Sequence, residues 1–334
     1  MAASAVIFGC EGPHLSPDEV AFFKEADPWG FILFLRNLEA PDQIRKLCDD
    51  LRNSVGREAP ILIDQEGGRV ARLRPPLASD WPNPKDHVAG LTADVASEVM
   101  YLRYRIIAEE LLSYGIDVNC APMLDVPLPS THDIIADRVY ADDPALVAQL
   151  GRAVMSGLLD GGVLPIIKHI PGHGRANIDS HLDLPRVDAD AAALQADFAP
   201  FKDLSDAPMA MTGHVLFEAY DPENCATMSS IMVDLIRTNI GFDGLLMTDD
   251  LSMKALKGGF KERVTGALSA GCDMILHCNG VMDEMQQVIS QTPMLSGQAQ
   301  NRADAALAAR RPAQPFDAEE ARMRLRDLLQ TRNA

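Results

Sequence analysis

The sequence has no pair of closely spaced cysteines, no long apolar run and no excess of positive charge. Its six cysteines are scattered without a C-x-x-C pair, several of them in apolar runs, so we expect buried, reduced thiols. A formal charge of −18 repels phosphate backbones and anionic membrane surfaces over long range. The composition therefore argues against nucleic acid as a partner.

The chain also lacks the features of an exported or membrane-spanning protein. Its N-terminus has no basic segment followed by a long apolar stretch, and no later apolar run approaches the length of a membrane span. We therefore expect a cytoplasmic protein with no membrane partner, and we take it to act as a monomer. The composition, 47% hydrophobic and 23% charged without a low-complexity block, is typical of a globular protein with a sizeable core.

Short β-like runs alternate with longer segments of helical spacing, which is the pattern of a parallel sheet with crossover helices. The β-like runs are residues 6–12, 30–35, 61–67, 116–126, 164–170, 209–215, 244–250 and 272–280. The helical candidates are residues 94–114 and 146–158, and the shorter 17–25, 42–54, 190–204, 230–239, 261–270 and 282–289. Eight strands with eight connections predict an α/β fold, a (β/α)8 TIM-type barrel. We expect a single catalytic domain over residues 1–290 and a helical tail, residues 291–334, packed on the barrel or extending from it.

Polar residues follow most of the predicted strands. In TIM-type barrels, the active-site residues lie at these C-terminal ends of the strands. The segments concerned are Asp64-Gln65-Glu66-Gly67-Gly68-Arg69, Asp125, Lys168-His169, Thr212-Gly213-His214, Thr248-Asp249-Asp250 and His277-Cys278-Asn279. A doubly wound open sheet would gather such residues at one switch point instead of on nearly every strand. The distribution favours the barrel.

Asp249 ends an apolar strand, which would hold its carboxylate rigidly at the barrel mouth, as a nucleophile requires. Successive strand residues face opposite sides, so we expect Asp250 to point away and bond to the following turn. The competing interpretation, given about equal weight on the motif alone, makes both carboxylates N-terminal caps of a helix.

Lys168 and His169 end a buried strand, where an unpaired lysine charge is costly. Lys168 can form an ion pair with Asp64 or Asp125, or it can bind substrate hydroxyls together with His169. Asp179 and His181 lie two apart in the loop that follows, where a histidine paired with an aspartate can give and then take a proton.

Three histidines within thirteen residues, His169, His173 and His181, raise the alternative of a metal site. Pro171 and Gly172 break the helix that would bring the first two onto one face, so the spacing argues against a metal. Three arginines, Arg69, Arg72 and Arg138, are forked donors suited to a polyol or a carboxylate.

Four motifs, in this order and spacing, resemble the family-three glycoside hydrolases, in particular the bacterial cytoplasmic β-N-acetylglucosaminidases (β-N-acetylhexosaminidases) of peptidoglycan recycling. The motifs are Asp64-Gln65-Glu66-Gly67-Gly68-Arg69-Val70, Lys168-His169-Ile170-Pro171-Gly172-His173-Gly174, Asp179-Ser180-His181 and Thr248-Asp249-Asp250-Leu251-Ser252-Met253. The resemblance covers most of the barrel. Two positions depart from the family pattern, Val139-Tyr140 after Arg138 and Gly213 before His214. We also expect the chain to act without the second α/β domain that many relatives carry.

The resemblance implies an exo-acting, retaining enzyme that removes terminal N-acetylglucosamine from muropeptides (GlcNAc-1,6-anhydroMurNAc-peptides). It makes Asp249 the nucleophile of a covalent glycosyl-enzyme and makes His181, assisted by Asp179, the acid-base. It further implies that the sugar is bound by Asp64, Arg72, Arg138, Lys168 and His169, with no cofactor and no metal. A phosphorylase using the same site, a metal-dependent barrel hydrolase and a glycan-binding sensor are the alternatives.

Overall fold

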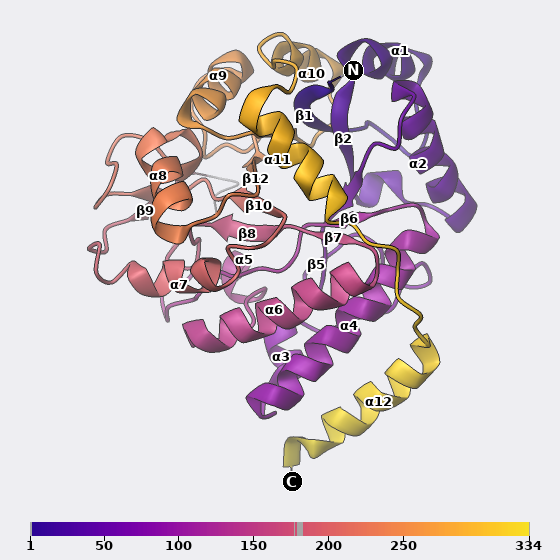
Figure 1. The fold of residues 1–334 in the computed structure, drawn as a ribbon, viewed down its shortest axis with the longest axis vertical. Helices are drawn as coiled ribbons and strands as arrows, with labels where there is room; N and C mark the ends of the chain where they lie inside the picture. The colour runs from indigo at the N-terminus through magenta and orange to yellow at the C-terminus, as the bar shows by residue number, and fades with distance from the viewer. Residues whose placement is uncertain (1, 177, 179–182, 334) are drawn as a thin grey trace.

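The computed structural model describes residues 2–176, 178 and 183–333, and Asp179 and His181 lie outside these residues. One sheet contains nine parallel strands in the order β7-β6-β3-β2-β1-β13-β12-β10-β8 (Figure 1). The strands are β1 (Ser4–Gly9), β2 (Pro28–Leu33), β3 (Ile61–Ile63), β6 (Val118–Asn119), β7 (Leu164–Pro165), β8 (Ile167–Ile170), β10 (Met209–Thr212), β12 (Leu245–Asp250) and β13 (Met274–His277).

The two ends of this sheet, β7 and β8, are consecutive in the chain and are separated only by Ile166. Because β7 pairs with β6 and β8 pairs with β10, the run at residues 164–170 joins both ends of the sheet. The eight predicted strand positions therefore form a closed barrel, and the TIM-type fold is confirmed.

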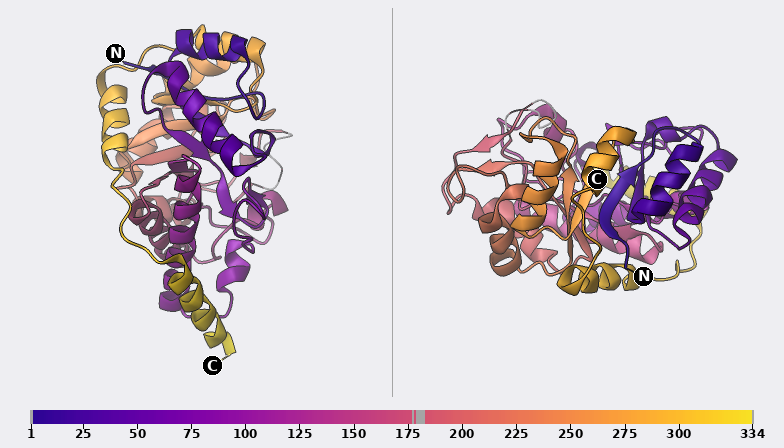
Figure 2. Two further views of the ribbon diagram at one scale, coloured as in Figure 1. Left: turned by 90° about the vertical axis from the view of Figure 1, so that its right-hand side faces the viewer. Right: turned by 90° about the horizontal axis from the view of Figure 1, so that it is seen from above.

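Helices surround the barrel and occupy the connections between its strands (Figures 1 and 2). The longer ones are α1 (Pro17–Ala26), α2 (Pro41–Val55), α4 (Ala93–Ser113), α6 (Pro144–Asp160), α7 (Gln195–Asp203), α9 (Phe260–Ala270) and α10 (Met282–Ile289). The shorter ones are α3 (Pro84–Val88), α5 (Asp133–Ala136) and α8 (Ser230–Leu235), which continues into a π-helical turn over Ile236–Ile240. A capping box at Ser16 begins α1, and the Asp143 side chain caps α6.

Alternation along the strands divides the core into two parts. Leu245 and Met247 of β12 belong to the cluster that fills the barrel, whereas Leu246 packs in the cluster between barrel and helices. The same division holds on β3, where Leu62 faces inward while its neighbours face the helices. Continuing this alternation past the strand ends directs Asp249 and Asp64 into the barrel mouth.

Two strand and helix predictions need correction. The run at 116–126 forms a continuous strand only over β6, with one further parallel bridge between Met123 and Lys168, because the Asn119 side chain bonds to the main-chain N–H and C=O of Gln65 and Pro122 lacks an N–H. The helix expected at 190–204 begins only at Gln195, after a turn in which the Asp190 side chain accepts from the Ala193 N–H.

Two further elements, α11 (Gly297–Ala308) and α12 (Ala318–Gln330), follow residue 290. Residues 293–295 hydrogen bond to the start of β1, and α11 then covers the N-terminal ends of the strands, where its Arg302 pairs with Asp243 and Asp273. Helix α12 packs on α4 and reaches the C-terminus at the narrow end of the molecule (Figure 2). The boundary between a barrel domain and a tail at residue 290 remains a prediction.

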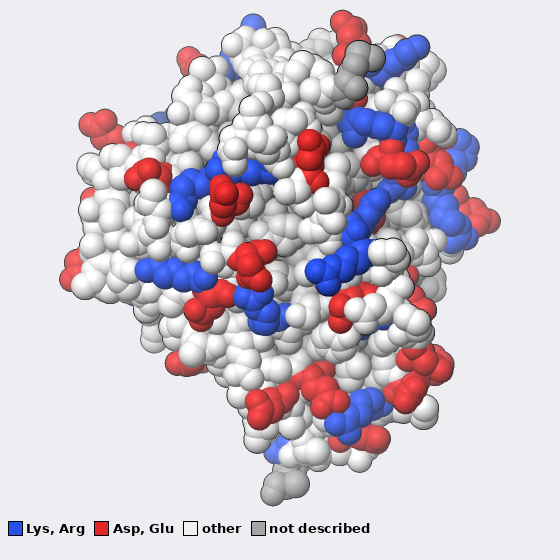
Figure 3. Space-filling view, in the orientation of Figure 1, with Lys and Arg blue, Asp and Glu red and all other residues white. Residues whose placement is uncertain are grey.

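On the face that carries α11, Lys and Arg side chains lie interspersed with Asp and Glu side chains (Figure 3). All six cysteines are buried and unpaired, as expected. Among the described helices, none combines the length and hydrophobicity that crossing a bilayer requires.

Candidate active site

A cavity of about 300 Å³ opens at the C-terminal ends of the barrel strands. It is lined by six of the residues predicted for the site: Asp64, Arg72, Arg138, Lys168, His169 and Asp249. The structure thus brings together side chains that are up to 185 positions apart, since 249 − 64 = 185. The remaining two predicted residues, Asp179 and His181, lie outside the described residues.

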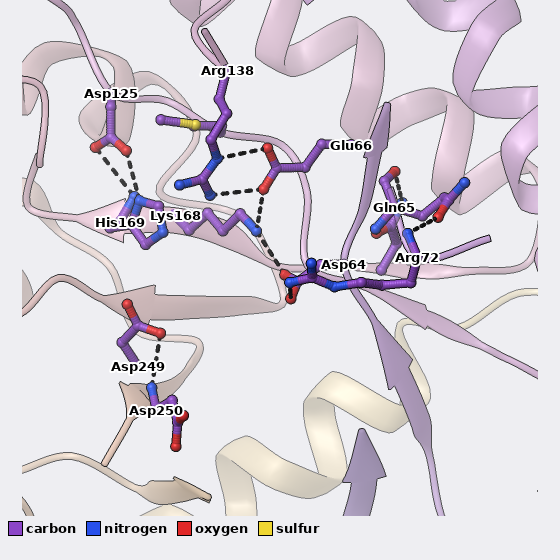
Figure 4. Close-up of polar contacts among 12 residues, drawn as sticks. Asp64, Gln65, Glu66, Arg72, Asp125, Arg138, Lys168, His169, Asp249 and Asp250 are labelled. Atoms are coloured by element: carbon purple, nitrogen blue, oxygen red, sulfur yellow. Dashed lines mark hydrogen bonds and ion pairs between the residues drawn. The ribbon is translucent and has the colours of Figure 1, made fainter. Parts of the chain in front are cut away.

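Asp249 stands at the end of β12, with its carboxylate facing the cavity. Burial opposes ionisation, but the His214 and His169 side chains hold its pKa below the ordinary aspartate range. The Asp250 N–H, which donates to Asp249 Oδ1 at 2.8 Å, acts in the same direction (Figure 4). An ionised, fixed carboxylate in a cavity is what nucleophilic attack needs.

Asp250 bonds to the following turn, as predicted, but it also lines the cavity instead of pointing away from it. Its carboxylate accepts hydrogen bonds from the main-chain N–H groups of Ser252 and Cys278, and so it stabilises the turn after β12. The interpretation of the two aspartates as helix caps is wrong, because the next helix, α9, begins only at Phe260.

Five side chains from three parts of the chain form a buried ion-pair network along one wall of the cavity (Figure 4). Lys168 Nζ lies 2.9 Å from Asp64 Oδ1 and 2.5 Å from Glu66 Oε1. Arg72 bonds to the second oxygen of Asp64 at 3.0 Å. Arg138 forms two parallel bonds with Glu66, at 2.8 and 3.0 Å. Of the two carboxylates considered as ion-pair partners of Lys168, Asp64 and Asp125, the structure shows Asp64.

These contacts outweigh the cost of burial for the charged forms. Burial opposes the ionised form of Glu66, but Arg138 and Lys168 lower its pKa to about 2. The pKa of Asp64 lies well below its ordinary range for the same reason, with Lys168 and Arg72 as the partners. The two carboxylates raise the pKa of Lys168 against its own burial. All five groups are therefore charged at neutral pH, with three cations against two anions.

His169 is held by Asp125, the carboxylate that was the other candidate partner of Lys168. His169 Nδ1 lies 2.7 Å from Asp125 Oδ2, and the ring of His173 packs edge-on against His169 with 5.5 Å between centroids. Burial is the main cause that lowers the pKa of His173 to about 4. His173 is thus neutral near pH 7.

Glu66 is the buried residue of the site to which the sequence analysis gave no role. Its position two residues after Asp64 was the available signal, because strand residues two apart point to the same side. The hairpin of β4 (Gln65–Gly67) and β5 (Val70–Ala71) then returns the chain so that Arg72 reaches Asp64. Neither the hairpin nor the role of Glu66 was predicted.

Comparison with known proteins places this geometry in a family. Residues 16–309 match the family described as "Glycosyl hydrolase family 3 N terminal domain". The chain is 37% identical over 289 residues to a β-hexosaminidase of Alkalilimnicola ehrlichii, with 84% of this chain and 82% of that protein covered. It is 36% identical over 294 residues to a β-hexosaminidase of Thiobacillus denitrificans, with 84% and 79% covered.

Solved structures show the same similarity. A family 3 β-N-acetylglucosaminidase from Paenibacillus superposes with a TM-score of 0.84 at 30% identity, over 97% of this chain and 67% of that one. NagZ from Neisseria gonorrhoeae, in complex with N-trifluoroacetyl-D-glucosamine, superposes with a TM-score of 0.83 at 28% identity, over 99% and 98%.

Proposed function

The chain belongs to glycosyl hydrolase family 3 and is a glycoside hydrolase, and we propose that it acts as an exo-acting, retaining β-N-acetylhexosaminidase. The observation that carries the proposal is the position of Asp249, an ionised carboxylate at the end of β12 facing a cavity lined by Lys168 and Arg138. The β-hexosaminidase activity of the relatives and the N-acylated glucosamine bound by the Neisseria protein support the choice of sugar.

In the proposed reaction, Asp249 attacks the anomeric carbon and forms a covalent glycosyl-enzyme as the bond to the leaving oxygen breaks. His181, as imidazolium assisted by Asp179, gives its proton to that oxygen. Neutral His181 then takes a proton from water, which attacks the anomeric carbon and releases Asp249. Two displacements at one carbon retain its configuration.

We assign sugar binding to His169 and to the network side chains that line the cavity. Asp64 and His169 offer acceptors for hydroxyl groups, and Lys168, Arg72 and Arg138 offer donors. Because the network's ion pairs already hold these side chains in place, they can bind a neutral sugar in fixed positions without rearranging.

The substrates that we propose are muropeptides with a terminal N-acetylglucosamine, GlcNAc-1,6-anhydroMurNAc-peptides, and the proposed location is the cytoplasm. Six buried, unpaired cysteines are typical of a protein kept in a reducing compartment. We propose that the protein acts as a monomer, which its sedimentation in solution tests.

Asp249→Asn tests the nucleophile, because the amide keeps the shape of the side chain but cannot attack. Turnover of a chromogenic N-acetylglucosaminide should fall roughly a thousandfold or more. Asp221→Asn is the matched control, since Asp221 is also a buried carboxylate but bonds to Ser229 and Asn224 away from the cavity. Turnover by Asp249→Asn close to that of the control would refute the assignment.

Analysis of the product formed from the same N-acetylglucosaminide by the unsubstituted protein, with and without phosphate or a chelator, separates the alternatives. Hydrolysis predicts a product with retained configuration whether or not phosphate is present, whereas a phosphorylase would yield the sugar 1-phosphate. A metal-dependent hydrolase would lose activity on chelation. A glycan-binding sensor would bind N-acetylglucosamine without turning over any glycoside.

A further inference from the structure

Asp125 is a fully buried carboxylate that follows the fourth strand position of the barrel. It accepts three hydrogen bonds, two from His169 in β8 and one from His173 just after it. Oδ2 lies 2.7 Å from His169 Nδ1, and Oδ1 accepts from the main-chain N–H of His173 at 2.6 Å and of His169 at 3.3 Å. The two oxygens therefore have different partners: Oδ2 contacts the His169 ring, and Oδ1 accepts only from main-chain N–H groups.

These contacts determine where the ring of His169 carries a proton. An ionised carboxylate can only accept hydrogen bonds, so the nitrogen that faces it must be the donor. Burial opposes ionisation of Asp125, but the His169 ring and the main-chain N–H of His173, which both donate to it, hold its pKa below the ordinary range. Nδ1 of His169 consequently carries the proton, and in the neutral ring Nε2 does not.

We propose that Asp125 is a positioning residue that fixes the proton of His169 on Nδ1 and so presents Nε2 to the cavity as a hydrogen-bond acceptor for a substrate hydroxyl. Asp125 itself does not contact substrate; it acts through His169, which lines the cavity. The inference rests on the proposed function in one respect, that His169 contacts the sugar.

Because the two oxygens of Asp125 have different partners, the Asp125→Asn change should affect the His169 ring and the main-chain contacts differently. The main-chain N–H groups of His169 and His173 need an acceptor, so the amide oxygen of the new side chain will take the place of Oδ1. The NH2 group then faces His169 Nδ1 and can only donate to it. The proton of the ring moves to Nε2, and the acceptor that faces the cavity becomes a donor.

The test combines kinetics with NMR of protein carrying 15N-labelled histidine. In the unsubstituted protein, the His169 ring, assigned by the signal lost in His169→Gln, should show protonated Nδ1. In Asp125→Asn it should show protonated Nε2. The kcat/KM on an N-acetylglucosaminide should fall roughly 10- to 100-fold, as expected when a buried hydrogen-bonding group loses its match.

Asp117→Asn is the matched control. Asp117 is a buried carboxylate just before β6, at the other end of the barrel, and it accepts from the Ile61 N–H and pairs with Arg52. It should cost stability without changing the His169 signals or kcat/KM.

Three results would overturn the inference: unprotonated Nδ1 in the unsubstituted protein, an unchanged ring in Asp125→Asn, or a changed ring with unchanged kcat/KM. The first does not need Asp125→Asn, so it can be tested even if that variant does not fold. The NMR result does not depend on turnover, whereas absence of turnover by the unsubstituted protein would count against the proposed function alone.

Discussion

At the scale of single residues, Glu66 illustrates how a buried charge supports a site. It is 1% exposed and compensates both Arg138 and Lys168, so the Glu66→Gln change leaves two buried cations with one fewer anion. Removing one partner of a buried ion pair typically costs about 3–5 kcal/mol of unfolding free energy. We expect a loss of that size in denaturant unfolding, and a higher KM because the two cations lose their fixed positions.

Glu218→Gln is the control for that change, because Glu218 pairs with Arg186 on the surface, at 3.3 Å, where a pair contributes less than about 1 kcal/mol. Equal losses of unfolding free energy in Glu66→Gln and Glu218→Gln would show that Glu66 contributes no more to stability than a residue in a surface ion pair.

The sequence could predict which residues gather at the barrel mouth but not how they pair. The strand ends identified Asp64, Lys168 and Asp249, because parallel strands bring their C-terminal ends together. Pairing depends on side-chain reach and on turns. Asp125 and Asp64 were equal candidates for Lys168 until the structure showed that Asp125 faces His169 instead.

At the scale of elements, the short turn after β8 must fit against the chain that follows β6. A Cβ atom built on Gly174 would overlap the main-chain carbonyl of Val126. Gly174→Ala should therefore push the two segments apart and destabilise the protein by about 1–3 kcal/mol. Activity should fall as well, because Gly174 follows His173 closely and His173 packs against His169.

Gly12→Ala is the control in thermal unfolding, since a Cβ at Gly12 meets no atom within 4 Å. If Gly174→Ala unfolds at the same temperature as Gly12→Ala, the close approach is not a constraint.

Elements were predicted well where periodicity alone determines them. Helix α10 was expected at 282–289 and α4 at 94–114, each within one residue of the observed bounds. Predictions were wrong where a side chain replaces main-chain hydrogen bonding. Asn119 does so at the end of β6, and Asp190 does so before α7. Hydrophobic patterns do not predict these side-chain hydrogen bonds, because they depend on which main-chain N–H group a polar side chain contacts.

At the scale of the whole molecule, one end of the barrel is open and the other is covered. The C-terminal ends of the strands carry the cavity and its charges, whereas α11 closes the N-terminal ends and buries Ala303 and Ala306 against the barrel. Acid conditions should act through buried groups with lowered pKa values, which include four histidines, His87, His173, His214 and His277, and the two carboxylates of the network.

Stability falls with falling pH for both the histidines and the carboxylates, but for different reasons and over different pH ranges. Burial lowers the pKa of His87 to about 3 and that of His173 to about 4, so the unfolded chain binds their protons first, from about pH 6.5 downward. Stability should begin to fall there. Asp64 and Glu66 have lowered pKa values, so their contribution is complete above about pH 4.5 and is lost as the pH falls toward about 2.

We expect unfolding free energy, measured with urea across this range, to decline in two steps. Glu66→Gln should flatten only the lower step, because it removes a carboxylate that titrates there. His87→Gln should flatten only the upper step, because His87 lies beside Arg103 and Trp81 and pairs with neither carboxylate. If both variants altered the same step, one of the two assignments would be wrong. A change in the upper step by Glu66→Gln would contradict the assignment of Glu66, and a change in the lower step by His87→Gln would contradict that of His87.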